Sequence, residues 1–486
     1  MNPDTPELAI AESAAELAAP FAPARPGWWA RLRADPVRMT AVRECWRALW
    51  LSRALVWVAG VGTVLAFGFG PVRNALNPPG VTRGFGWLGS LLAAPAARWD
   101  AAWYLVIARY GYRPELGVFT SSRTAFFPLY PLGLRAICSL GLPPVLAGVL
   151  LSLAALSLAL YGIHRLTTLE LARVAGAGRV ASAARLAVMA TALAPMAFFF
   201  SAVYSESLYL ALSVGLFWSA RQGRWMWVGA LGALAGATRS TGLVLALPAL
   251  MLYLYGPRED RPPDGRAHAR RLEGGGQELG PARALSAGAA IAALRPRYRL
   301  RRDVLWLALL PAGVILYCAF LGLAGGNPLA PLHAQEIWGR HFVGPYLGVW
   351  DGAKAALDGA RQLLSFQRRH VYFAIAAGSP FVNAGHNLML LAFLLAAIPA
   401  IVGVLRRLPL AYGAYVIAAL ALPLSYPVRA QPLMSLPRFL VVLFPLTIWL
   451  AAWLAERPRA QVPALALSGA LMAFFAAQFA TWHWVA

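Results

Sequence analysis

The sequence predicts an all-helical protein that crosses a membrane many times, and its composition and the lengths of its apolar segments carry this prediction. Of the 486 residues, 59% are hydrophobic and only 13% are charged, whereas soluble domains usually carry about 25% charged residues. The apolar residues form long blocks, for example 54–70, 304–325 and 388–405. Blocks of this length are enough, or nearly enough, to cross roughly 30 Å of hydrocarbon, so a water-soluble fold is not expected.

The charge of the chain is strongly positive. A net charge of +23 would suggest nucleic-acid binding in a soluble protein. Here the arginines lie mostly in short loops between apolar blocks, which is how orientation in a membrane is encoded. We therefore expect membrane lipids, and no nucleic acid, among the binding partners.

The N-terminal residues 1–45 are interpreted as a disordered cytoplasmic tail, and residues 46–486 as one transmembrane domain. Residues 1–26 are rich in Ala, Pro and Glu and lack the apolar core of a signal peptide. Five arginines between positions 31 and 47 precede the first span, so the positive-inside rule places the N-terminus in the cytoplasm.

Apolar length and arginine positions predict about eleven spans in a cell-membrane protein whose C-terminus lies outside. The expected spans are 52–70, 145–163, 184–201, 206–220, 225–238, 242–255, 303–325, 386–405, 409–425, 437–455 and 462–483. The piece 125–142 is short and contains two prolines; placing it along the membrane surface keeps the basic loop 164–185 in the cytoplasm. The apolar run 225–255 is split at Arg239, because a charge in mid-bilayer is costly.

This topology leaves two large extracytoplasmic loops, 71–144 and 326–385, and one flexible basic cytoplasmic loop, 256–302. The cytoplasmic loop is rich in Gly, Arg and Pro and poor in large apolar residues, which is typical of flexible segments. The outer loops hold most of the polar side chains that are candidates for chemistry, so we expect an extracytoplasmic active site.

Carboxylates on the outer side are informative because they are scarce, and the candidates are Asp100, Glu115, Glu206, Glu336, Asp351 and Asp358. Asp100 begins an aromatic surface segment, where it is either a functional anion or an N-cap of an interfacial helix. Glu206 lies between two apolar spans, where a carboxylate is costly unless it has a partner or a function. The alternative for Glu206 is a solvated turn residue.

Two arginines near the outer surface are candidates for binding a phosphate group. Arg239 is flanked by threonine and serine residues, and arginine with neighbouring hydroxyls suits a phosphate. The alternative for Arg239 is a structural ion pair, for which Glu206 is the candidate partner. Arg438 opens a span, and snorkelling to the interface is its simpler interpretation.

The sequence predicts neither a metal site nor a cofactor. His333 and His341 are eight positions apart with no third histidine nearby. Cys45, Cys138 and Cys318 are scattered and show no metal-binding spacing.

Several short motifs follow one another along the chain. They are 98–112 with 125–131, which begins Arg98-Trp99-Asp100-Ala101, then 200–208, 237–242, 326–338 and 437–439. In this order they resemble the PIG-V family of mannosyltransferases. Eukaryotic members add the second mannose of the GPI anchor, and this chain resembles their bacterial relatives.

The resemblance implies a GT-C fold, a multi-span helical enzyme that uses a polyprenyl-phosphate-sugar donor and a glycolipid or glycan acceptor. It implies mannose as the sugar. The GT-C fold places a carboxylate in the first outer loop and an acidic motif in the next outer loop along the chain. The expected topology places Asp100 in the loop 71–144 and Glu206 in the short outer turn between the spans 184–201 and 206–220. The motifs imply substrate binding by Arg98, Trp99, Tyr104, Tyr204, Arg239, Gln335 and Arg438.

The donor carries its own leaving group, so transfer needs a base for the acceptor hydroxyl and cations for the departing phosphate. We expect Asp100 to be the base, Arg239 and Arg438 to be the cations, and Glu206 to orient the acceptor or hold Arg239. A single displacement would invert the anomeric centre.

The alternative function is a multi-pass transporter or lipid flippase, in which Arg239 and Glu206 would form a gating pair. The two large outer loops and the lack of an internal repeat argue against it.

Overall fold

The computed structural model describes residues 35–70, 76–82, 86–112, 122–263, 296–324, 326–373 and 378–485. The chain divides into two compact units, Met1–Glu44 and Cys45–Ala486. Within the described residues every regular element is a helix, and the extended pairing is limited to isolated bridges at Val428 with Arg340 and Gln431. The all-helical prediction is therefore confirmed.

Among the described residues, four helices are long and apolar enough to cross a membrane: α3 (Pro36–Phe67), α9 (Pro144–Leu171), α19 (Pro380–Arg407) and α23 (Pro458–Ala480). A fifth span is possible if η6 (Arg302–Leu309) and α16 (Ala312–Leu323), which bend by 43°, act together. All five coincide with expected spans.

The other expected spans correspond to shorter helices: α10 (Ala177–Ala192), α11 (Glu206–Arg221), α12 (Trp225–Thr238), α13 (Ala246–Tyr255), α20 (Leu410–Leu424) and α22 (Phe444–Ala455). The total of about eleven spans therefore stays a prediction. Because α3 begins at Pro36, the last ten residues of the expected tail are helical rather than disordered. Residues 1–34 lie outside the described part of the chain.

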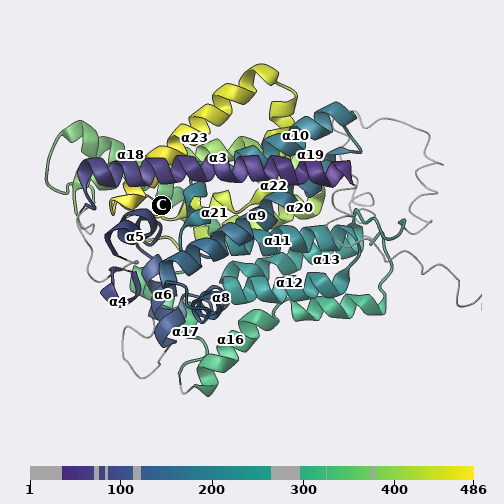
Figure 1. Ribbon diagram of the computed structural model, residues 1–486, viewed down its shortest axis with the longest axis horizontal. Coiled ribbons are helices and arrows are strands. Elements are labelled where there is room, and N and C mark those ends of the chain that lie inside the picture. Colours follow the sequence, from purple (N-terminus) through teal and green to yellow (C-terminus); the bar gives the residue numbers. More distant parts are fainter. Residues whose placement is uncertain are drawn as a thin grey trace, which may run out of the picture. The chain divides into compact units, whose positions relative to one another are not determined.

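Helices α9 and α11 run in the same direction and approach closely because α9 presents glycines to its neighbour (Figure 1). A Cβ on Gly148 would lie 2.7 Å from Cγ1 of Val203, and a Cβ on Gly162 would lie 2.5 Å from Cγ1 of Val214. The two pairs occur in the same order along both segments. The two helices therefore begin at one end of the bundle and finish together at the other.

Helix α12 runs back along α11. A Cβ on Gly215 would lie 3.3 Å from Leu231, and one on Gly232 would lie 3.4 Å from Leu216. Arg239, directly after α12, lies 3.0 Å from Glu206 at the start of α11. The end of α12 therefore returns to the start of α11, and Figure 1 shows α11, α12 and α13 side by side.

The break expected in the run 225–255 is present. Helix α12 ends at Thr238, and Arg239 is extended with φ −157° and ψ 149°. The chain continues into η5 (Ser240–Leu245) and α13. Gly242 makes the sharp return possible, because a Cβ there would lie only 2.3 Å from the backbone of Ala235.

The described residues of the expected first outer loop, 71–144, form short helices that include α4 (Pro79–Thr82), α5 (Gly86–Ala93), η2 (Ala94–Ala96), α6 (Ala101–Tyr110) and α8 (Leu129–Cys138). Helix α8 has ten residues and is therefore ~15 Å long, about half the roughly 30 Å of hydrocarbon. Because α13 is equally short and yet corresponds to an expected span, this length does not decide the question, and the surface position of 125–142 stays a prediction.

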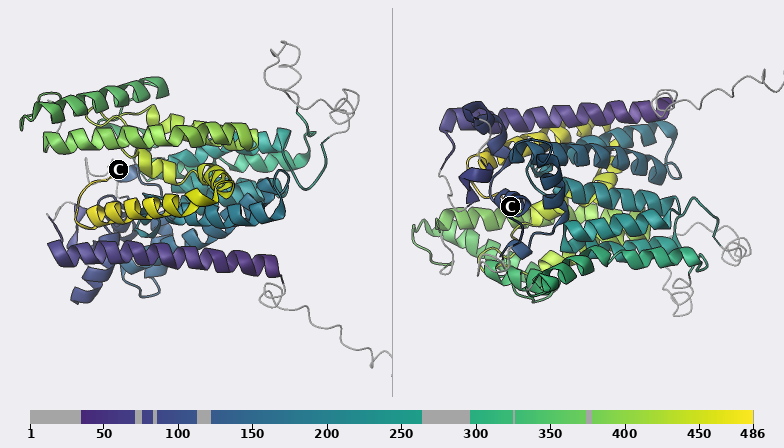
Figure 2. Two further views of the ribbon diagram at one scale, coloured as in Figure 1. Left: turned by 90° about the horizontal axis from the view of Figure 1, so that it is seen from above. Right: turned by 60° about the horizontal axis from the view of Figure 1, so that its bottom comes forward.

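The second outer loop contains α17 (Ala330–His333), η7 (Ala334–Trp338) and α18 (Pro345–Ser365). Helix α18 lies along α19 (Figure 2, left), and the contact is tight because a Cβ on Gly359 would lie 2.9 Å from the carbonyl oxygen of Ala384. Of the expected cytoplasmic loop 256–302, the structure describes residues 256–263 and 296–302.

Helix α11 occupies the centre of the apolar core, and both of its ends are charged. Phe217 and Leu210 of α11 belong to one buried cluster that also includes Phe199 and Phe444. Glu206 at its first position and Arg221 at its last are each 0% exposed. Buried charges require partners, and each end of α11 supplies them.

Candidate active site

Two carboxylates and two guanidinium groups from four distant segments meet at the start of α11. Arg438, in α21 (Leu436–Val441), places Nη1 2.8 Å from Oδ2 of Asp100 and Nε 2.8 Å from Oε1 of Glu206. Arg239 places Nη1 3.0 Å from the same Oε1. The structure thus brings together the two residues expected to be catalytic and the two expected to bind phosphate.

Glu206 is completely enclosed in this cluster. Oε1 accepts a hydrogen bond from Arg239 and lies in ion-pair contact with Arg438, although the Nε–H of Arg438 is not aligned for a hydrogen bond. Oε2 is buried and has no hydrogen-bond partner among the described residues. A solvated turn residue is therefore the wrong interpretation of Glu206, and the ion pair with Arg239 is confirmed.

Arg438 does not snorkel to an interface. Its guanidinium lies among aromatic rings, 5.3 Å from the ring centroid of Tyr204 and 5.7 Å from that of Phe199. The residue is buried, because its two carboxylate partners offset the desolvation of its charge.

Asp100 precedes α6 but does not cap it. Its backbone is in the right-handed helical region, and its side chain makes no hydrogen bond to the start of α6. Instead the carboxylate turns to Arg438. The N-cap interpretation is therefore wrong, because the Asp100 carboxylate accepts a hydrogen bond from Arg438 and none from the backbone N–H groups at the start of α6.

The backbone just before Asp100 is strained. Trp99 has φ +56°, a left-handed conformation that costs a non-glycine residue of order 1–3 kcal/mol. Tertiary packing holds it, because the Trp99 ring contacts Trp482 and Trp484 at centroid distances of 5.9 and 5.4 Å. The left-handed turn at Trp99 sets the direction in which the side chain of Asp100 points away from the backbone.

The two carboxylates differ in access. The side chain of Asp100 is 25% exposed and that of Glu206 is 0% exposed. An incoming molecule can reach Asp100, whereas Glu206 is screened by both arginines.

Tyr104 and Tyr204 connect the motifs to each other. The Tyr104 hydroxyl is 2.9 Å from Oγ of Ser205, next to Glu206. The Tyr204 hydroxyl donates to the carbonyl oxygen of Arg98, two residues before Asp100, at 3.0 Å. Both rings are buried, and burial raises the pKa of Tyr104 to about 12. Each of these hydroxyls therefore links the segment that carries Asp100 to the segment that carries Glu206.

Arg98 points away from the carboxylates. Its Nε donates to the carbonyl oxygen of Ala480 at 3.1 Å, and its guanidinium lies 4.8 Å from the ring centroid of Trp482. Burial lowers the pKa of Arg98 to about 10, so it stays protonated at neutral pH. In this arrangement Arg98 anchors the first motif to the C-terminal segment.

The second outer loop reaches the site through a turn after η7. The carbonyl oxygen of Gln335 accepts the backbone N–H of Arg340 at 3.2 Å, and Trp338 contacts the ring of Phe126 at a centroid distance of 6.2 Å. Gln335 thus shapes this turn through its backbone. Arg340, which the motif comparison did not select, is the charged side chain that the turn presents.

The remaining outer carboxylates are not part of the cluster. Asp351 and Asp358 pair with Lys354 and Arg361 on α18, and Glu336 is exposed in η7. Glu115 lies outside the described residues. Within the described residues, no group of three His, Cys, Asp or Glu side chains could hold a metal ion.

An apolar hollow adjoins the backbone of the first motif. It lies between α3, η2, η4 (Ala197–Ser201) and α23. Its lining includes Trp57, Leu92, Ala96, Phe198, Phe479 and Ala480. Two of these lining residues also form hydrogen bonds with the site segments. The carbonyl oxygen of Ala96 accepts the N–H of Val203 at 3.0 Å, and the carbonyl oxygen of Ala480 accepts the Nε–H of Arg98.

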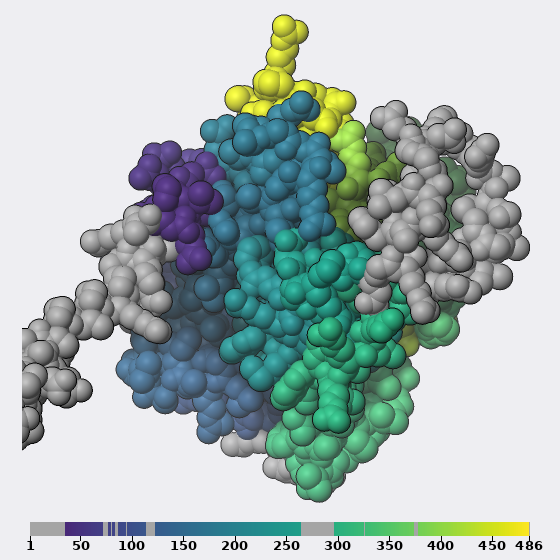
Figure 3. Space-filling model, turned by 90° about the vertical axis from the view of Figure 1, so that its right-hand side faces the viewer, coloured from purple at the N-terminus to yellow at the C-terminus, as the bar shows by residue number. Residues whose placement is uncertain are grey.

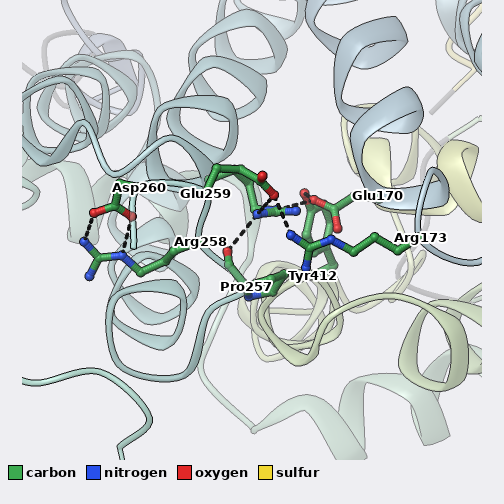
Figure 4. Close-up of polar contacts among 8 residues, drawn as sticks. Glu170, Arg173, Pro257, Arg258, Glu259, Asp260 and Tyr412 are labelled. Atoms are coloured by element: carbon green, nitrogen blue, oxygen red, sulfur yellow. Dashed lines mark hydrogen bonds and ion pairs between the residues drawn. The ribbon is translucent and has the colours of Figure 1, made fainter. Parts of the chain in front are cut away.

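A second charged cluster lies where α9 and α11 end, roughly 22 Å along α11 from Glu206. Arg221 contacts Glu170 at 2.5 Å, and the same carboxylate oxygen accepts the Tyr412 hydroxyl at 2.8 Å. Arg221 also donates to the carbonyl oxygen of Pro257 at 3.0 Å. Figure 4 shows Glu170, Pro257, Glu259 and Tyr412 close to one another in this cluster.

Glu259 closes the second cluster on its exposed side by pairing with Arg173 at 2.6 Å. In the face seen in Figure 3, the blue segments around α9 and α10 lie next to the teal segments of α11 to α13. The contacts of Arg221 with Glu170 and Pro257, and of Glu259 with Arg173, tie the chain after α13 to the ends of α9 and α11.

Comparisons with known proteins agree with the resemblance drawn from the motifs. The family model described as Mannosyltransferase (PIG-V) matches residues 72–254. A curated relative from Cricetulus griseus, described as GPI alpha-1,6-mannosyltransferase 2, is 36% identical over 169 residues. The alignment covers 33% of this chain and 31% of the relative, so the chain spans about a third of the length of the curated relative it matches. No solved structure matches this chain.

Proposed function

We propose that this chain, which belongs through residues 72–254 to the PIG-V-like mannosyltransferase family, is an integral membrane glycosyltransferase. It transfers mannose from a polyprenyl-phosphate donor to a glycolipid or glycan acceptor on the outer face of the membrane. One observation carries the proposal: an accessible carboxylate, Asp100, lies against a buried guanidinium, Arg438, at 2.8 Å. A base and a cation in contact are what this displacement needs.

In the proposed reaction the acceptor hydroxyl oxygen attacks C1 of the mannosyl group. The bond between C1 and the phosphate oxygen breaks, and its electron pair leaves with polyprenyl phosphate. The hydroxyl proton passes to Asp100, the more accessible of the two carboxylates. One displacement inverts the anomeric centre, so a β-linked donor yields an α-linked product.

The departing phosphate gains negative charge as the bond to C1 breaks. Guanidinium groups stabilise such charge because their planar forks bind phosphate oxygens through two parallel hydrogen bonds. Arg239 and Arg438 are both partly accessible, with side chains 13% and 10% exposed. Held by Glu206, they need little reorganisation during the reaction.

The protein groups around the reacting centre have supporting roles. Glu206 positions the two arginines, since it is buried between them. Tyr104 and Tyr204 position the segments of Glu206 and Asp100 through their hydroxyls.

The test uses the purified full-length protein in lipid nanodiscs with polyprenyl-phosphate [¹⁴C]mannose and a membrane glycolipid fraction. We expect release of polyprenyl phosphate together with a labelled glycolipid whose mannose is α-linked. Movement of donor across a sealed bilayer without cleavage of its glycosyl bond would overturn the proposal and favour a flippase.

A further inference from the structure

We propose that Arg340 is a third cation of this site and binds the phosphate group of the lipid donor. The inference rests on the proposed function, because it names a further residue that recognises the donor. It follows from the charge balance of the cluster and from the position of the turn that carries Arg340.

The four charged residues already described neutralise one another. Asp100 and Glu206 carry two negative charges, and Arg239 and Arg438 carry two positive charges, and three ion pairs of 2.8 to 3.0 Å join them. A phosphodiester approaching this set meets two carboxylates that repel it and two guanidinium groups that are already engaged. A further positive charge that no carboxylate holds would therefore strengthen binding of the donor phosphate, in addition to the contacts of Arg239 and Arg438.

Arg340 supplies an uncommitted charge. No carboxylate lies within ion-pair distance of it in the part of the chain that the structure describes. Its side chain is held by one bond, from Nη1 to the carbonyl oxygen of Tyr426 at 3.1 Å. Burial lowers its pKa to about 10, with a further decrease from the charge of Arg438 and an opposing increase from Asp100. Arg340 is therefore protonated at neutral pH and lies in the field of both residues.

The backbone ties Arg340 to the segment that leads into α21. Arg340 pairs with Val428 in an isolated antiparallel bridge, and the N–H of Val343 donates to the carbonyl oxygen of Ser425 at 2.9 Å. The segment that begins at Ser425 leads directly into α21 and Arg438.

The other side of the same turn faces the first outer loop. Trp338 contacts Phe126, and the ring of Phe126 stacks on Trp103 at a centroid distance of 5.7 Å. Trp103 belongs to α6, three residues after Asp100. The turn is thus held between the two segments that carry Asp100 and Arg438.

Arg98 and Arg361, two other arginines of the expected outer segments, do not fit this role. Arg98 donates to Ala480 and lies over Trp482. Arg361 is exposed on α18 and pairs with Asp358 at 3.1 Å. Arg361 is therefore a matched control, because it is an outer arginine that lies apart from the site cluster.

The test compares wild type, R340Q, R340K and R361Q as purified full-length proteins in nanodiscs, with two probes: polyprenyl phosphate and the uncharged polyprenol of the same length. R340Q should bind polyprenyl phosphate roughly tenfold more weakly, or worse, since it loses a charge-assisted hydrogen bond to the phosphate. Its affinity for polyprenol should equal that of wild type. R340K should lie between the two, and R361Q should match wild type for both probes.

Equal binding of polyprenyl phosphate by wild type and R340Q would overturn the inference. So would an equal loss for both probes, because that pattern indicates a structural role for Arg340. Mannosyl transfer by the wild type, measured separately, tests the proposed function. If the wild type transfers mannose and R340Q binds polyprenyl phosphate as tightly as the wild type does, only the role of Arg340 is refuted. A wild type that cleaves no donor would refute the function itself.

Discussion

The guanidinium of Arg438 lies 2.8 Å from the carboxylate of Asp100, although 338 positions separate the two residues in the chain. The contact joins the first outer loop to α21 and completes the charged cluster around Glu206. Because the Asp100 carboxylate binds Arg438, it does not cap α6, although the local sequence suggests a helix cap. The first prediction follows from this pair.

Asp100→Asn should lower mannosyl transfer by about 10²–10⁴-fold, the usual contribution of positioned proton transfer. Asparagine keeps the size of the side chain but cannot take the proton of the acceptor hydroxyl at neutral pH. Initial rates in nanodiscs, normalised to folded protein, measure the effect. The control is Asp358→Asn on α18, which should leave the rate unchanged. Near-native transfer by Asp100→Asn would exclude Asp100 as the base and make Glu206 the next candidate.

Arg239→Ala should reduce kcat/KM for the donor by roughly a hundredfold, the typical loss when one preorganised donor to a developing anion is removed. Arg239→Lys should lose less, because lysine keeps the charge but not the planar fork. Steady-state kinetics at varied donor concentration distinguish the two variants. If both retained full activity, Arg239 would be only the structural partner of Glu206.

Arg221→Met should destabilise the protein without changing its chemistry. Removing one member of a buried ion pair costs about 3–5 kcal/mol, because the other charge is left without a partner. The expected result is a lower midpoint of thermal unfolding in detergent, with an unchanged transfer rate per folded molecule.

The double variant Glu170→Gln with Arg221→Met is the matched comparison for that prediction. It removes both buried charges of the pair and should recover part of the lost stability. A transfer rate that falls in Arg221→Met while the unfolding midpoint stays constant would contradict a purely structural role for this cluster.

The orientation of α9 can be tested at its two ends. Leu140 and Val174 flank the helix and are 78% and 76% exposed. In a variant whose three cysteines are replaced by alanine, we expect Leu140→Cys to react with an impermeant maleimide in intact cells. Val174→Cys should react only after permeabilisation, because the basic loop around it is predicted to be cytoplasmic.

The reverse labelling pattern would invert the topology and place the site of Asp100 and Glu206 on the cytoplasmic side. Labelling of both positions in intact cells would show that α9 does not cross the membrane. Either result would be independent of the transfer assays.

Much of the helical architecture is predictable from local sequence. Apolar length locates α3, α9, α19 and α23, and the charge of Arg239 locates the break between α12 and α13. These features are predictable locally, because the free-energy cost of placing a charge in hydrocarbon depends on the short segment that carries the charge. The motifs also identify Asp100, Glu206, Arg239 and Arg438, all of which lie in one cluster.

The partners of those residues could not be predicted from local patterns. An aspartate before a helix most often caps it, and an arginine at the start of a span most often snorkels. In this protein both residues are held by long-range contacts, which no window of sequence reveals. Arg340 was missed for the same reason, since its neighbours Tyr426 and Val428 are more than eighty positions away.

The amino-acid sequence by itself determined that this chain is helical and rich in membrane-crossing segments, and it marked the residues that carry chemistry. It did so because the cost of burying backbone and charge in hydrocarbon acts on each short segment separately. Only the tertiary structure decided that Asp100 is accessible while Glu206 is enclosed, and that Arg438 joins them. Burial and ion pairing depend on which distant side chains fill the surrounding space, and that is a property of the packed helices.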